Sequence, residues 1–350
     1  MKSKLLYLHM QKPQILIVYT GGTIGMIQDE QTGELRPLNF EYIPTHVSEL
    51  NRIDCELTIH SFDPLMDSSN MHPDVWILLG ELIEKNYDKF DGFVILHGSD
   101  TMAYTASALS FMLENLSKPV IITGSQLPVG VIRTDAKENL ITAIEIAAHK
   151  TNGVATVPEV AIYFDYQLMR GNRAKKFNTV KFEAFRSTDY HILAEAGVHL
   201  KFYPRYIEPA RTGPFAVQKV MDNAVGTLKV YPGMPQEFVR PILLNKAIKA
   251  LIIEGFGAGN ATTMEWFVEA LNEAVQSGLI VVIITQCQGG AVDLGRYETS
   301  GMFKRFGCIS GADMTYEAAL TKLMYLLAKH DDKEIVKKMI EVPISGELTV

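Results

Sequence analysis

Short apolar runs rich in β-branched residues alternate with longer stretches of helical periodicity through the first half of the chain. The runs lie at residues 15–20, 56–60, 92–97, 119–123 and 159–164, and helical stretches lie between them at about 74–87, 101–115 and 134–149. Apolar strands separated by helices are typical of βαβ units, in which helices cover both faces of a mainly parallel sheet. The pattern therefore predicts an α/β domain.

The alternation stops between residues 197 and 224, where proline and glycine are frequent and no long periodicity is present. Such a segment is typical of a linker. A second set of strands and helices follows, with strands near 226–231, 250–254 and 279–285 and helices near 262–277, 313–329 and 332–341. We therefore expect an N-terminal α/β domain over residues 1–196, a linker over 197–224 and a C-terminal α/β domain over 225–350.

Composition and charge narrow the location and the partners. The 350 residues are 47% hydrophobic and 21% charged, as in folded globular proteins, and the net charge of −7 argues against a nucleic-acid partner. Three cysteines (Cys55, Cys287 and Cys308) form no disulfide framework and no metal-binding spacing. The apolar part of the N-terminus is too short for a signal peptide, and no apolar segment approaches the ~20 residues of a membrane span. We expect a cytoplasmic protein without nucleic-acid or membrane partners.

Polar residues follow three of the predicted strands. The first strand ends in Thr20-Gly-Gly-Thr-Ile-Gly25, the second leads to Asp67-Ser-Ser-Asn70, and the third ends in His97-Gly-Ser-Asp100. Taken singly, each segment has a structural explanation, since glycines turn the chain and Ser68, Ser69 or Asp100 can cap the helices that follow. The glycine-rich segment fits neither a phosphate-binding loop nor a dinucleotide fingerprint. Because ligands bind beyond the carboxyl ends of parallel strands, the three segments together predict a site at one sheet edge.

The residue types in these segments suit acyl transfer without a metal ion, in which a hydroxyl attacks and a neighbour accepts its proton. His97 is the one histidine in these segments, and its place at a strand end before a glycine favours a structural role. A lysine can act as the base instead; the candidates are Lys175 and Lys176, between which spacing alone does not decide. Asp100 can bind an ammonium group while Ser68 binds a carboxylate, which together describe a free α-amino acid.

Two of these segments resemble the signatures of bacterial-type L-asparaginases: Thr20-Gly-Gly-Thr-Ile-Gly25 and Leu96-His-Gly-Ser-Asp-Thr-Met102. Further motifs are similar to the cytoplasmic type I branch; they are Pro64–Met71, Gly124-Ser-Gln126, Arg170-Gly-Asn-Arg173 and Gly311–Thr315. The resemblance implies a larger N-terminal parallel-sheet domain, a smaller C-terminal flavodoxin-like domain and a homo-oligomer, either a dimer or a dimer of dimers. It also implies hydrolysis of L-asparagine to L-aspartate and ammonia without a cofactor.

Carried over by position, the resemblance assigns a role to each site residue. Thr23 matches the nucleophile that forms a β-aspartyl ester, and Ser99, Asp100 and Lys176 match the second catalytic group. Ser68, beside Ser69, matches the residue that binds the substrate α-carboxylate, and Asn260 matches a residue contributed by a neighbouring subunit. The backbone N–H of Ser99 is a candidate oxyanion donor. The substrate-binding set implied in this way is Gly22, Ser68, Ser69, Ser99, Asp100 and Asn260.

The sequence departs from the family pattern at three places. Ser99 stands where threonine is more usual, and the loop over residues 28–37 lacks the tyrosine that often activates the nucleophile; Glu34 lies near that register and Tyr42 further on. Some type I enzymes bind asparagine at an allosteric site through an arginine and a cysteine. Cys287 matches the cysteine, but Glu254 occupies the place of the arginine. Because a carboxylate there would repel the carboxylate of the effector, we expect a vestigial allosteric site.

Other functions remain open at the level of sequence. One alternative is a glutaminase-asparaginase of broader specificity. Another is the amidotransferase subunit that releases ammonia for a tRNA-bound partner, which is expected to carry an additional N-terminal domain, whereas only a short segment precedes the first strand here. A non-catalytic amino-acid sensor is a third, and the complete set of Thr23, Ser99, Asp100 and Lys176 argues against it, since binding alone needs no nucleophile.

Overall fold

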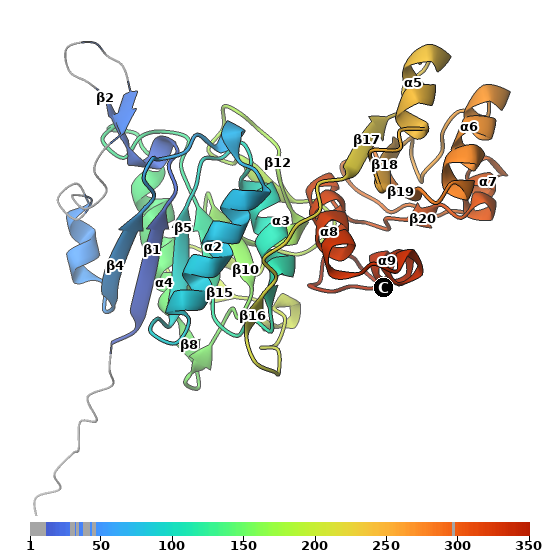
Figure 1. Cartoon of the computed structure of the whole chain (residues 1–350). Coiled ribbons are helices and arrows are strands. Elements are labelled where there is room, and N and C mark those ends of the chain that lie inside the picture. Colours follow the sequence, from blue (N-terminus) through green and yellow to red (C-terminus); the bar gives the residue numbers. More distant parts are fainter. Residues whose placement is uncertain (1–11, 29–31, 33–34, 38–42, 44–46, 296–297) are drawn as a thin grey trace, which may run out of the picture.

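The computed structural model describes residues 12–28, 32, 35–37, 43, 47–295 and 298–350. They form two α/β bodies that lie side by side, one from each half of the chain (Figure 1). The predicted α/β class is therefore confirmed. The predicted Glu34 and Tyr42 lie outside the described residues.

The N-terminal body is built on a sheet with strand order β15-β14-β11-β10-β7-β5-β1-β4. The five strands β4, β1, β5, β7 and β10 are parallel, and β11, β14 and β15 extend the sheet in antiparallel fashion. The parallel strands coincide closely with the predicted ones: β1 (Gln14–Tyr19), β4 (Glu56–Ser61), β5 (Gly92–Leu96), β7 (Val120–Thr123) and β10 (Val160–Phe164). The antiparallel strands, which the alternation did not predict, are β11 (Gln167–Arg170), β14 (Ala194–Ala196) and β15 (Leu200–Phe202).

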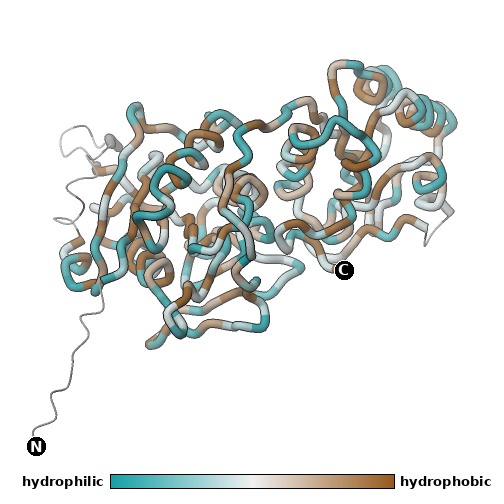
Figure 2. The backbone as a smooth tube through the Cα atoms, turned by 60° about the horizontal axis from the view of Figure 1, so that its bottom comes forward, coloured by the Kyte–Doolittle hydropathy of each residue, from teal (hydrophilic) through white to brown (hydrophobic). Residues whose placement is uncertain are grey.

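Helices cover both faces of this sheet. α2 (Pro73–Asn86) and α3 (Met102–Met112) pack on one face, and α4 (Ala136–Ala148) packs on the other (Figure 1). The strands between them, β5, β7 and β10, are mostly apolar and are buried along their whole length. Figure 2 shows hydrophobic stretches of the chain alternating with hydrophilic ones. A sheet buried on both faces explains why these strands appear in the sequence as continuous apolar runs.

The C-terminal body has a four-stranded parallel sheet in the order β17-β18-β19-β20. Its strands are β17 (Val225–Lys229), β18 (Ala250–Gly255), β19 (Ile280–Thr285) and β20 (Ile309–Ser310). The helices around it are α5 (Gln236–Leu243), α6 (Glu265–Gln276), α7 (Glu298–Phe306), α8 (Tyr316–Lys329) and α9 (Lys333–Ile340). α8 also packs against α3 of the N-terminal body, so apolar side chains of both halves meet in one cluster.

The segment 197–224 contains regular structure as well as loops. β15 forms the outer edge of the large sheet, and β16 (Ala216–Val217) pairs with β6 (Leu113–Glu114), which directly follows α3. The chain thus stays in contact with the N-terminal body along part of this segment before it enters the C-terminal sheet.

Candidate active site

Three loops meet at the carboxyl ends of β1, β4 and β5. The backbone N–H and the side-chain hydroxyl of Thr20 both donate to the carbonyl of Leu96, at 3.0 and 2.9 Å. The N–H of Met66 donates in turn to the carbonyl of Thr20, at 2.8 Å. The loop after β1 is therefore bonded on one side to β5 and on the other to the loop after β4. The prediction that these polar segments gather at one sheet edge is confirmed.

Glycines let these loops approach each other at the backbone. Gly22 has φ +91°, and a Cβ placed there would lie 2.6 Å from the backbone of Gly98. A Cβ on Gly98 would lie 2.4 Å from the Oγ of Ser68. Because real side chains do not tolerate such distances, glycine at both positions is a requirement of the close packing.

The loops enclose a pocket of about 390 Å³. Thr23 lies at its edge at the start of the short 3₁₀ helix η1 (Thr23–Gly25), directly after the positive-φ residue Gly22. The lining residues are Tyr19, Gly21, Gly22, Thr23, Met26, Leu65, Met66, Asp67, Ser68, Gly98, Ser99, Asp100, Gln126, Lys176 and Thr179. The pocket thus unites Thr23, Ser68, Ser99, Asp100 and Lys176, which come from four separate parts of the chain.

Lys176 contacts both members of the Ser99–Asp100 pair. Its Nζ donates to Ser99 Oγ at 2.8 Å and to Asp100 Oδ1 at 2.6 Å. It comes from β12 (Ala174–Lys176), where successive side chains point to opposite sides, so the neighbouring Lys175 faces away from the pocket toward Glu317. The geometry therefore selects Lys176, which spacing alone did not.

Asp100 does not cap the following helix. The N-cap of α3 is Thr101, whose hydroxyl donates to the carbonyl of Ser68 at 2.7 Å. The carboxylate of Asp100 is bound to Lys176 instead, and its side chain remains 63% exposed. This exposed fraction leaves carboxylate surface available for a substrate ammonium group.

Ser68 and Ser69 point in different directions. Ser68 is buried and lines the pocket, whereas Ser69 is exposed and is not among the lining residues. The N–H and the hydroxyl of Ser69 both donate to Asp67 Oδ1 at 2.9 Å, and these bonds lower the pKa of Asp67. Ser69 thus stabilises the turn that holds Ser68, and it lies outside the pocket.

His97 is a buried structural residue. Trp76 donates from Nε1 to Thr105 Oγ1 at 3.0 Å, so the hydroxyl of Thr105 is left to donate to His97 Nε2 at 2.9 Å. His97 Nδ1 lies 2.6 Å from the carbonyl of Gly98 and must therefore carry the proton. Burial lowers the pKa of His97 to about 4, and the ring is neutral at neutral pH.

The other predicted residues lie in the C-terminal body and do not line this pocket. Asn260 pairs through its backbone with Phe256 in the loop after β18, Glu254 lies on β18, and Cys287 is exposed after β19. Glu254 and the buried Glu317 repel each other, and Glu254 adds to the rise in the pKa of Glu317 that burial causes.

Gln126 is a pocket residue to which sequence reasoning gave no role, although its Gly124-Ser-Gln126 motif was noted. Its backbone N–H donates to Asp135 Oδ2 at 2.9 Å, and its Nε2 donates to the carbonyl of Lys181 at 2.9 Å. Tyr19, the last residue of β1, is a second such residue, and burial raises its pKa to about 12. In the sequence Tyr19 belongs to the apolar run of the first strand, so nothing distinguished it as a site residue.

In the described part of the chain, no helix combines the length and the apolar character needed to cross a bilayer. Among the same residues, no three His, Cys, Asp or Glu side chains converge as metal ligands would. The pocket therefore presents hydroxyl, carboxylate and ammonium groups at the edge of an α/β sheet, an arrangement suited to acyl transfer.

The fold and this pocket define a class of α/β protein that has two bodies built on parallel strands and a site of hydroxyl, carboxylate and ammonium groups at the edge of the larger sheet. Residues 14–208 match the asparaginase N-terminal domain, and residues 224–340 match the glutaminase/asparaginase C-terminal domain. The chain belongs to the asparaginase family.

Individual relatives span almost the whole chain. L-asparaginase 1 of Escherichia coli K12 is 43% identical over 350 residues, covering 97% of this chain and 99% of that protein. The crystal structure of L-asparaginase I from Vibrio cholerae superposes with a TM-score of 0.88 at 41% identity, covering 97% and 100% of the two chains. The thermostable L-asparaginase from Thermococcus kodakarensis gives a TM-score of 0.88 at 32% identity, covering 96% and 99%. The predicted family is confirmed.

Proposed function

We propose that this protein is an L-asparagine amidohydrolase that forms L-aspartate and ammonia through a covalent ester on Thr23. The observation that carries the proposal is the contact of Lys176 Nζ with both Ser99 Oγ and Asp100 Oδ1 in the pocket that Thr23 also lines. A binding site for an amino acid would need the carboxylate and the donors, but it would not need a nucleophile beside a hydroxyl–lysine–carboxylate group.

In the first half-reaction, the hydroxyl oxygen of Thr23 attacks the side-chain amide carbon of asparagine. The carbonyl oxygen gains negative charge, which backbone N–H groups such as that of Ser99 stabilise. The C–N bond then breaks, and the departing nitrogen takes up a proton equivalent to the one lost by Thr23, so that ammonia leaves. The β-aspartyl ester on Thr23 remains.

In the second half-reaction, water attacks the ester carbonyl while Ser99, Asp100 and Lys176 act together to remove its proton. The ester bond breaks, Thr23 recovers its proton and aspartate leaves. The substrate is held by the exposed carboxylate of Asp100 at its ammonium group and by Ser68 at its α-carboxylate. Gly22, Ser69 and Asn260 complete the proposed binding set, with Ser69 acting through the Asp67 turn and Asn260 from a neighbouring subunit.

The test is ammonia release from asparagine by the purified protein, with Thr23→Ala as the matched control. We expect turnover by the wild type and loss of nearly all activity in the variant. If the wild type binds asparagine but releases no ammonia, the protein is a non-catalytic amino-acid sensor and the proposal is wrong. Equal rates with glutamine and asparagine would identify the broader glutaminase-asparaginase instead.

The cellular setting and the assembly belong to the same proposal. Cys55, Cys287 and Cys308 are free cysteines, which are typical of a reducing compartment and support the proposed cytoplasmic location. We propose a homo-oligomer, either a dimer or a dimer of dimers. We also propose two domains joined by a linker within residues 197–224, after β15 of the N-terminal sheet.

A further inference from the structure

The Arg170-Gly-Asn-Arg173 motif is buried between the two bodies and binds the C-terminal residues of the chain. Arg170, Asn172 and Arg173 are each 2% exposed or less. Asn172 Nδ2 donates to the carbonyl of Ser345 at 3.0 Å, and Arg173 Nε donates to the carbonyl of Gly346 at 2.8 Å. This motif forms η5 (Gly171–Arg173) and passes directly into β12, which carries Lys176.

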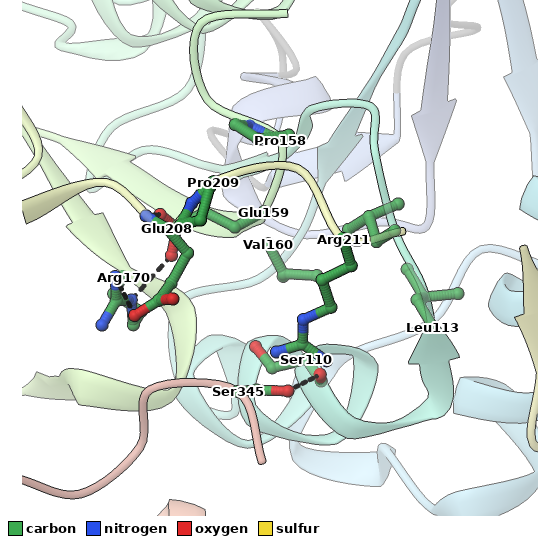
Figure 3. Close-up of a pocket in the computed structure, with 11 residues that line it drawn as sticks. Ser110, Leu113, Pro158, Glu159, Val160, Arg170, Glu208, Pro209, Arg211 and Ser345 are labelled. Atoms are coloured by element: carbon green, nitrogen blue, oxygen red, sulfur yellow. Dashed lines mark hydrogen bonds and ion pairs between the residues drawn. The ribbon is translucent and has the colours of Figure 1, made fainter. Parts of the chain in front are cut away.

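The same C-terminal residues also bind α3. Ser345 Oγ donates to the carbonyl of Ser110 at 2.5 Å, as the dashed line in Figure 3 shows. Ser110 lies in α3, which begins two residues after Asp100. Ser345 therefore joins α3, which follows Ser99–Asp100, to η5, which precedes the strand that carries Lys176.

The C-terminal segment, residues 342–350, is itself held in place. Glu347 and Lys322 form an ion pair at 2.6 Å with both side chains fully buried. Glu347 also accepts the N–H of Ser345 at 2.7 Å, and Lys322 donates to the carbonyl of Val342 at 2.8 Å.

A second anchor lies at the end of the C-terminal segment. Asp313 accepts the N–H of Thr349 at 2.8 Å and pairs with Arg173 at 2.9 Å. The acceptors that Asn172 and Arg173 contact are thus fixed in space.

We propose that the C-terminal segment positions the second catalytic group, with Ser345 and Asn172 as the positioning residues. Lysine has a long, flexible side chain, so contacts of 2.8 and 2.6 Å to two partners in the loop between β5 and α3 require a fixed backbone at both ends. The segment fixes η5 and α3 to a single residue and so sets the separation of Lys176 from Ser99 and Asp100. This inference rests on the proposed function, because it assigns the group to hydrolysis of the ester.

The test compares Ser345→Ala and Asn172→Ala with wild type in steady-state and rapid-mixing experiments. If the second catalytic group is misplaced, hydrolysis of the ester slows more than its formation, so kcat falls by about tenfold or more while kcat/KM falls less. The ester then accumulates, and intact-protein mass spectrometry of acid-quenched enzyme detects an aspartyl adduct on the variant. Ser345→Thr, which keeps the hydroxyl, is expected to restore kcat.

Tyr325→Phe is the matched control, since it removes a hydrogen bond to Glu114 that also joins the two bodies but contacts neither Ser345 nor Asn172. We expect it to keep the kcat of the wild type. Unchanged kcat in Ser345→Ala would overturn the proposal, as would equal losses of kcat and kcat/KM without an adduct. If Asn172→Ala does not fold, Ser345→Ala decides. A wild type that releases no ammonia would instead reject the proposed function itself.

Discussion

Ser99 provides a hydroxyl and a backbone N–H but lacks the methyl group of threonine. The methyl group restricts χ1, whereas serine rotates more freely. In this protein Lys176 compensates by donating to Ser99 Oγ at 2.8 Å, which favours one orientation of the hydroxyl. The chemistry at this position therefore depends on the hydroxyl and its lysine partner more than on the branched side chain.

We predict that Ser99→Ala loses most turnover and that Ser99→Thr retains it. The alanine variant removes the acceptor of the Lys176 hydrogen bond, while the threonine variant keeps it. Steady-state ammonia release by the two variants checks this prediction. Near-normal turnover in Ser99→Ala would show that the hydroxyl has no catalytic part.

His97 makes stability depend on pH in mildly acidic solution. Its pKa is lowered to about 4 in the folded protein from 6.5, because burial disfavours the charged ring. The unfolded chain therefore binds more protons between these values, and stability falls as the pH is lowered through this window. We predict that the free energy of unfolding of the wild type falls when the pH is lowered from 7 to 5. The fall is expected to be about 2 kcal/mol larger than in His97→Gln, which has no such group to protonate. Urea unfolding at the two pH values measures this difference; equal losses would contradict it.

At the scale of elements, the site depends on how closely the loops after β1, β4 and β5 approach. A Cβ on Gly98 would lie 2.4 Å from Ser68 Oγ and 2.7 Å from Ser68 Cβ. Any side chain at Gly98 must therefore displace Ser68 from the pocket wall. The same crowding would not occur at Gly197, where the nearest atom to a Cβ is 3.9 Å away.

We predict that Gly98→Ala raises the KM for asparagine by about tenfold or more, since a displaced Ser68 binds the α-carboxylate poorly. Gly197→Ala, in open space, serves as the control and should keep the KM of the wild type. Initial-rate curves for both variants give the comparison. A wild-type KM in Gly98→Ala would remove Ser68 from the binding set.

At the scale of the whole molecule, the C-terminal body brings a second group of charges close to the junction. Glu254 lies on β18 near Glu317, whose pKa burial raises, and Lys175 of the N-terminal body is the cation that opposes this rise. An effector that carries its own carboxylate would meet two glutamates here. The negative electrostatic field of these two glutamates therefore disfavours binding of an amino-acid activator, whose carboxylate would need a cation such as arginine.

We predict near-hyperbolic kinetics with asparagine, because the proposed vestigial site at Glu254 and Cys287 does not favour the effector. The measurement is the rate over a wide asparagine range at fixed enzyme concentration. A strongly sigmoidal curve would contradict the prediction.

The five parallel strands of the large sheet, the helices between them and the family could all be predicted from the sequence. These features depend on local periodicity and on short motifs such as His97-Gly-Ser-Asp100, which can be read without knowing the fold. The short strands β11, β14 and β15 escaped prediction because a strand of three or four residues has too few positions for periodicity. Ser68 and Thr23 could be named from their loops, but a role for Ser69 in the Asp67 turn could not.

Spacing alone left Lys175 and Lys176 open, and the family resemblance assigned Lys176; the folded structure adds the contacts of Lys176 and what holds it in place. Lys175 and Lys176 are adjacent and chemically identical, and their difference arises from the direction in which β12 presents each side chain. Ser345 contacts Asn172, which lies 173 positions earlier in the chain, and Ser110, which lies 235 positions earlier. No local pattern records such a pairing, because it depends on how the last residues of the chain return to pack between the two bodies.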